Sequence, residues 1–175
     1  MAATSSSTDA AGSGVTLGVT TDLTSATTIT TGATGTITVA SGITFSSTGA
    51  TTINGTLTKA GAGTLELGNV TGAATIAVSA GALVVRGTGT EAITVASGAT
   101  LASINGSTTG SVTVAAGGLL SPGRASGGIG QIDIGSLNLS AGTFVADLGG
   151  SSASAYDHVR SEEHTSELQS HLMIS

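Results

Sequence analysis

The stretch Ile-Thr-Val-Ala-Ser-Gly-Ala-Thr-Leu, residues 93–101, decides the fold because variants of it recur along the chain. Ile93, Val95 and Leu101 have small polar neighbours, which is typical of a strand with one buried face. The Ala-Ser-Gly between them suits a bend, since glycine reaches positive φ without a Cβ penalty. Each copy therefore predicts a strand, a corner and a second strand. The related phrases occupy residues 37–45, 76–84, 112–120 and 137–145.

The spacing of these phrases predicts how they are arranged. Their central glycines lie 39, 17, 19 and 25 residues apart, and Gly63 divides the first gap into 21 and 18. A loose period of roughly 20 residues is typical of one coil of a solenoid. Stacked coils would place one apolar residue of each phrase in an inward ladder. The residues expected in this ladder are Ile37, Ile76, Ile93, Val112 and Leu137.

The sequence therefore predicts an all-β protein, a right-handed parallel β-helix (β-solenoid) of seven to eight coils. It would extend over residues 15–159. The alternative is an antiparallel β-sandwich, which also has short strands and glycine turns. Repetition of one phrase, rather than alternation alone, favours the solenoid.

Composition narrows the classes of function. The 175 residues are enough for one domain, and the absence of cysteine excludes disulfides, thiolate zinc sites and cysteine nucleophiles. The net charge is −6 and only 2% of residues are aromatic, so we predict no nucleic-acid partner. Apolar runs are far shorter than the ~20 residues of a membrane helix, so we predict no membrane insertion.

Two groups of motifs resemble one known family. Thr58-Lys-Ala-Gly-Ala-Gly-Thr-Leu-Glu-Leu67 is similar to a repeat opener of the autotransporter-associated β-strand repeat proteins. Leu119-Leu-Ser-Pro-Gly123, Asp147-Leu-Gly-Gly150 and Tyr156-Asp157 follow in that family's order. The resemblance covers most of residues 55–159.

The resemblance implies a passenger segment that is secreted or displayed on the bacterial outer surface through a downstream anchor or barrel. We expect a stiff stalk or adhesin-like scaffold rather than an enzyme. The expected partners are surface glycans or other cell-surface proteins, together with further copies of the chain joined end to end. Solenoids need capped ends, and uncapped ends are prone to associate.

The two ends of the chain differ from the repeats. Residues 1–14 have neither the basic nor the apolar region of a signal peptide, so we expect a disordered or incomplete N-terminal segment. Residues 160–170 match, one for one, the translation of an Illumina-type sequencing adapter. We therefore expect residues 160–175 to be a non-native tail. His164 and His171, with Glu163 and Glu167, would form a metal site only if that tail were native protein.

Two clusters outside the tail are candidates for chemistry. Asp133 and Asp147 are fourteen residues apart and could meet as the acid and base of a polysaccharide-cleaving β-helix, with Arg124 and Phe144 nearby. Residues 156–158, Tyr-Asp-His, could form an acid–base site. Strand neighbours point to opposite faces, however, so an exposed turn is the simpler interpretation. The glycine-rich residues 127–130 are expected to be a turn. The sequence thus predicts no catalytic residue, no cofactor and no metal ligand.

Threonine pairs suggest an alternative function. Residues 28–30, 36–38 and 56–58 each place threonine at i and i+2, on one side of a strand. Stacked in register, they would form a flat array like that of threonine-rich ice-binding solenoids. Residues 76–78 and 112–114, which are expected to correspond, do not keep the pair.

Overall fold

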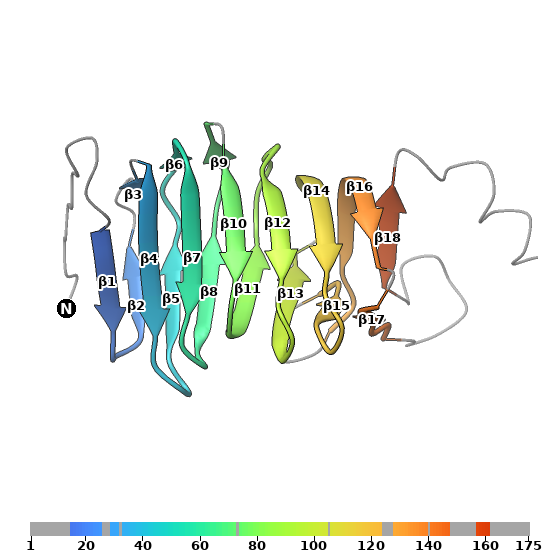
Figure 1. Cartoon of the computed structure of the whole chain (residues 1–175), viewed down its shortest axis with the longest axis horizontal. Helices are drawn as coiled ribbons and strands as arrows, with labels where there is room; N and C mark the ends of the chain where they lie inside the picture. The colour runs from blue at the N-terminus through green and yellow to red at the C-terminus, as the bar shows by residue number, and fades with distance from the viewer. Residues whose placement is uncertain are drawn as a thin grey trace, which may run out of the picture.

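The computed structural model describes residues 15–25, 29–31, 33–72, 74–104, 106–123, 128–139, 141–147 and 157–161. These residues form eighteen strands and no helix. Figure 1 shows the strands side by side along one axis, with a front layer and a back layer. The part of the chain that the structure describes has no helix with the length and hydropathy needed to cross a bilayer.

The strands belong to three parallel sheets. Sheet A contains β1 (Val15–Val19), β4 (Thr34–Val39), β7 (Thr56–Ala60), β10 (Thr75–Val78), β12 (Ala92–Val95), β14 (Ser107–Val114), β16 (Gln131–Asn138) and β18 (His158–Ser161). Sheet B contains β2 (Leu23–Ser25), β5 (Thr44–Ser47), β8 (Thr64–Leu67), β11 (Gly81–Val85), β13 (Ala99–Ser103), β15 (Leu119–Ser121) and β17 (Thr143–Phe144). Sheet C contains β3 (Ile29–Thr31), β6 (Thr51–Ile53) and β9 (Val70–Thr71).

This topology confirms the predicted solenoid. Each strand pairs in parallel with its counterpart one coil away, which an antiparallel sandwich cannot do. In Figure 1 the strands of sheet A from β1 to β14 run downwards in front and the strands of sheet B behind them run upwards, while the chain advances from left to right. The winding is therefore right-handed, as predicted.

The number of coils is slightly smaller than predicted. The chain makes about six turns rather than seven to eight. The prediction assumed roughly 20 residues per coil throughout. In register, Ser107 aligns with Ile132 and Gln131 aligns with His158, so the last two coils take 25 and 27 residues. The β18 strand includes Arg160 and Ser161, the first two residues of the expected tail. Residues 1–14 and 162–175 lie outside the described residues, so the expectations for both ends stay predictions.

The inward ladder is largely as predicted. Residues Leu57, Ile76, Ile93, Val112 and Leu137 stack in one row of sheet A. Ile37 is the exception, because it aligns with Lys59 in the neighbouring row. This shift of two residues keeps Ile37 on the inward face, where it is buried, since strand side chains alternate with a period of two.

Sheet B supplies the opposite wall of the core. Its inward row is made of large apolar residues that are 3% exposed or less: Phe45, Leu65, Leu83, Leu101 and Leu120. Together the two inward rows form the continuous hydrophobic core that a single coil could not bury alone.

Val95 tests the inward face of sheet A. Val95 is 1% exposed, whereas its neighbour Thr94 faces solvent. Val95→Asp should lower the free energy of unfolding by at least about 4 kcal/mol, because it buries an unpaired charge. Thermal unfolding followed by circular dichroism measures the loss. Thr94→Asp is the matched control and should change stability by less than about 1 kcal/mol. Equal stability of the two variants would show that the assigned faces are wrong.

Candidate functional site

Lys59 is the only lysine of the chain, and it lies inside the solenoid with 0% of its surface exposed. It occupies an inward position of β7, in register with Ile37 and Val78. Its Nζ donates to the carbonyl oxygens of Ala60 (3.0 Å) and Gly61 (2.7 Å) at its own corner. It also donates to the carbonyl oxygen of Ala80 (3.0 Å) in the next coil. The three bonds use all three ammonium protons and join the corners of two consecutive coils.

Lys59 belongs to the repeat-opener motif of residues 58–67, and the glycines of that motif let these corners approach each other. Gly61 has φ of 75°, a conformation that side chains with a Cβ rarely adopt, and a Cβ there would collide with the carbonyl oxygen of Val39. A Cβ on Gly63 would collide with the carbonyl oxygen of Ala40. The motif that carries the family resemblance thus has a structural role, in which lysine supplies donors and the glycines permit close stacking.

Burial lowers the pKa of Lys59 to about 8, from an ordinary value of 10.5. The folded chain therefore releases this proton at lower pH than the unfolded chain does. Between these two pH values the unfolded state binds more protons, so stability rises with pH. Below about pH 8 both states hold the proton and the contribution is constant.

The pH dependence of stability checks this state of Lys59. In the unmodified protein the free energy of unfolding should rise from about pH 8 to 10.5. Lys59→Met keeps an apolar stem of similar length but removes the titrating amine, so the rise should disappear. Denaturant titrations at intervals of half a pH unit measure both curves. An identical rise in the two proteins would assign the effect to other groups.

A second polar cluster lies on the outer side of sheet B. Ser46 and Glu66 are in register on β5 and β8. The Arg86 guanidinium donates from Nη1 to Glu66 Oε2 (2.6 Å) and to Ser46 Oγ (3.1 Å), and Ser46 Oγ donates to Glu66 Oε2 (3.0 Å). The three residues come from three successive coils, so the cluster links the coils along the axis. Glu66 belongs to the repeat-opener motif, which again has a structural use.

Asp157 has a similar role near the C-terminal end. Its carboxylate accepts hydrogen bonds from the backbone N–H of Gly130 (2.7 Å) and of Asp147 (2.9 Å). The carboxylate of Asp147 in turn accepts from the N–H of Gly128 (2.9 Å). Residues 156–158 were predicted to form an exposed turn. Asp157 is instead buried, because it fixes the loop before β16 to the segment after β17. Tyr156, Arg124 and residue 127 lie outside the described residues.

The structure does not pair Asp133 with Asp147. Asp133 lies on β16 of sheet A, where its Oδ1 accepts from Gln131 Nε2 (3.0 Å) and lies 4.0 Å from Arg160 Nε. Asp147 follows β17 of sheet B and is bonded to the Gly128 backbone. Each carboxylate therefore has its own hydrogen-bond partners, and the two share none.

A groove of about 380 Å³ lies next to Asp133, over Gly110 and Gly135. Thr108, Thr109 and Thr90 contribute to its walls, and Arg160 and Ser161 of β18 contribute as well. These last two residues belong to the segment expected to be non-native, so the groove supports no assignment. Among the described residues, no three His, Asp or Glu side chains lie close enough together to hold a metal ion.

Glu91 is a buried acid that the sequence prediction missed. It is 1% exposed, and among the described residues no donor reaches either carboxyl oxygen with hydrogen-bond geometry. Burial raises the pKa of Glu91, with a smaller opposing effect from its own backbone N–H. The sequence did contain a signal for this burial, because Glu91 precedes the inward Ile93 by two residues and so shares its face of the strand. Glu91 is thus a buried acid of the solenoid interior, and we assign it no function.

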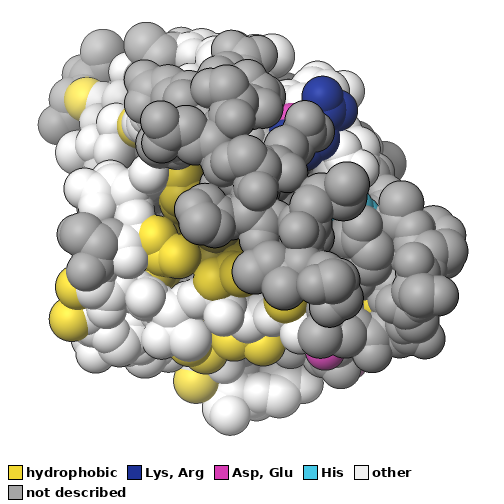
Figure 2. Space-filling view, turned by 90° about the vertical axis from the view of Figure 1, so that its right-hand side faces the viewer, with side chains coloured by type: hydrophobic (Ala, Val, Ile, Leu, Met, Phe, Trp, Pro, Cys, Tyr) yellow, Lys and Arg dark blue, Asp and Glu magenta, His cyan; other side chains and the backbone are white. Residues whose placement is uncertain are grey.

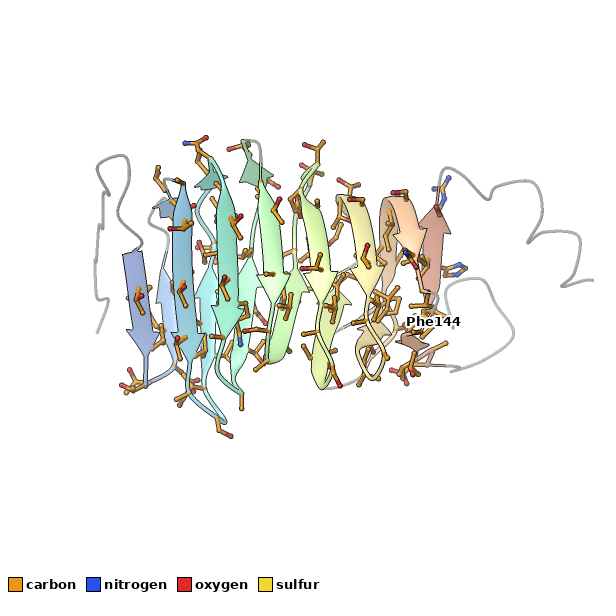
Figure 3. The ribbon with its side chains drawn as sticks, in the orientation of Figure 1. Phe144 is labelled. Carbon is orange, nitrogen blue, oxygen red and sulfur yellow. The ribbon has the colours of Figure 1, made fainter. Side chains whose placement is uncertain are left out.

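The outer face of sheet A carries a regular array of small side chains. One row contains Thr16, Thr36, Thr58, Ala77, Thr94, Thr113 and Asn138. The row beside it contains Thr34, Thr56, Thr75, Ala92, Ser111 and Ser136. Figure 3 shows short, oxygen-tipped side chains projecting from the front of this sheet on successive strands.

This register corrects the predicted threonine pairs. Thr36 aligns with Thr58, and Thr38 aligns with Ala60, so the pair that stacks on residues 56–58 is residues 34–36. The coils that were expected to break the array contribute Thr75 and Thr113 to it. Ile76, Val78, Val112 and Val114 face inward instead, and Ala77 is the residue that interrupts the outer row. The array is therefore more continuous than the sequence indicated.

Comparison with known proteins finds no matching family model, no matching curated protein and no matching solved structure.

Proposed function

We propose that this chain is a passenger or stalk segment of a bacterial secreted or surface-displayed autotransporter-like protein. Its task is mechanical, because a stiff rod holds what it carries at a distance from its anchor. Surface glycans or other cell-surface proteins are the partners that such a stalk would meet.

The observation that carries this proposal is the continuity of sheet A over eight parallel strands, from β1 to β18. Neighbouring coils are joined by backbone hydrogen bonds that run along the axis, so the load between coils is shared by two or three sheets. Lys59, the Ser46–Glu66–Arg86 cluster and Asp157 add side-chain links between coils or coil ends. The resemblance motifs support the proposal because several of their residues make these links.

A surface-display experiment tests the mechanical role. The chain is placed between an outer-membrane barrel and an epitope tag, and the binding of an antibody to the tag on intact cells is measured. The tag should remain accessible with Thr94→Asp. It should lose at least half of its accessibility with Val95→Asp, in which the rod unfolds. Equal accessibility with both variants, at matched surface amounts, would contradict a spacing function.

Ice binding is the second candidate function, and the corrected register of sheet A favours it. Strands lie about 4.8 Å apart and alternate residues about 6.6 Å apart, so the two rows form a two-dimensional lattice of hydroxyl and methyl groups. A rigid lattice of small groups can match the surface of ice, which is itself a regular lattice. Thr16, Thr94 and Thr113 are exposed on this lattice.

Thermal hysteresis separates the two functions. If sheet A binds ice, the protein should show hysteresis, and Thr36→Tyr should reduce it at least several-fold by disrupting the flat array. Thr64→Tyr, on the outer side of sheet B, is the control with a similar change in size. Absence of hysteresis in the unmodified protein rejects this second function and leaves the stalk proposal unaffected.

A further inference from the structure

The described C-terminal end of the solenoid presents apolar residues. Phe144 on β17 aligns with Leu120 and so continues the inward row of sheet B, yet it is 40% exposed. Leu137, Leu139 and Val159 are only partly buried against the core. Figure 2 looks onto this end and shows hydrophobic side chains on it, and Figure 3 places Phe144 there. Phe144 is thus far more exposed than Leu120, its fully buried counterpart one coil earlier.

The opposite end begins the same rows. Leu23 on β2 aligns with Phe45 and is the first described member of the row that ends at Phe144. Leu17 on β1 aligns with Ile37 in sheet A. Both leucines are partly buried against the core. Each end therefore offers half of the contact that successive coils already make inside the chain.

Strand direction decides how these halves fit together. Within the chain each coil is related to the next by translation along the axis, and all strand pairs are parallel. A second copy translated along the axis would present β1 to the second half of β16, β2 to β17 and β3 to β18, all in the same parallel sense. Two copies that met through identical ends would have to reverse the strands, which breaks the register of both ladders.

We propose that a second copy of this chain docks head to tail, with Leu23 of one copy packed over Phe144 of the other. The contact continues an interface that is already established between successive coils, including its apolar rows and its backbone pairing. Such a contact is heterologous, so it does not close at two copies and extends into filaments. The inference rests on the two ends alone and goes beyond the proposed stalk function.

Sedimentation velocity over a hundredfold concentration range tests the docking. The unmodified protein should form a concentration-dependent series of assemblies. Phe144→Asp blocks the C-terminal end and Leu23→Asp blocks the N-terminal end, so each variant alone should be monomeric. An equimolar mixture should give a one-to-one dimer and nothing larger, because only one intact pair of ends remains. Thr94→Asp adds the same charge away from both ends and should assemble normally.

A second measurement does not depend on the folding of the Leu23 variant. Phe144→Asp retains an intact N-terminal end, so excess variant should terminate assemblies of the unmodified protein and shorten them. Circular dichroism confirms that the variant is folded. Monomeric unmodified protein at the highest concentration overturns the proposal. So does assembly that persists in Phe144→Asp, or a failure of that variant to shorten the assemblies.

Discussion

The structure depends on parallel backbone pairing between consecutive coils. This pairing fixes a spacing of about 4.8 Å along the axis, so each side chain lies directly over its counterpart in the next coil. Like residues therefore stack on like, and a small set of residue types satisfies every coil. Isoleucine, leucine and valine fill the interior, threonine and serine cover the outer face of sheet A, and glycine allows the corners to approach.

The same spacing explains where the charged residues lie. The neighbouring coils do not repeat an ionised residue at the same position. Its charged group must therefore find other polar partners in those coils. Lys59 uses the carbonyl oxygens of two corners, and Arg86 reaches across to Glu66 and Ser46. Asp157 uses backbone N–H groups in the same way. The few charges within the solenoid serve its assembly. Glu91 is the exception, because no residue in the described part of the chain donates a hydrogen bond to its carboxyl oxygens.

The fold could be predicted from the sequence because its signal is local and repeated. The alternation at Ile93 and Val95, together with the glycine corners, is enough to predict a parallel stack of coils. The shift of two residues at Lys59 could not be predicted, because it leaves every side chain on its expected face. The threonine rows were misaligned for the same reason. The lengths of the last coils and the partners of Asp157 depend on contacts 10 and 27 residues away in segments without a repeated phrase.

The burial of Lys59 gives the folded chain an unusual chemical property. The only side-chain amine of the protein is enclosed between two coils and engaged by three carbonyl oxygens. Amine-directed reagents and lysine-specific proteases can act on it only after these coils separate. The rate of its modification therefore reports the local opening of one defined corner, at a position in the middle of the rod, without any introduced label.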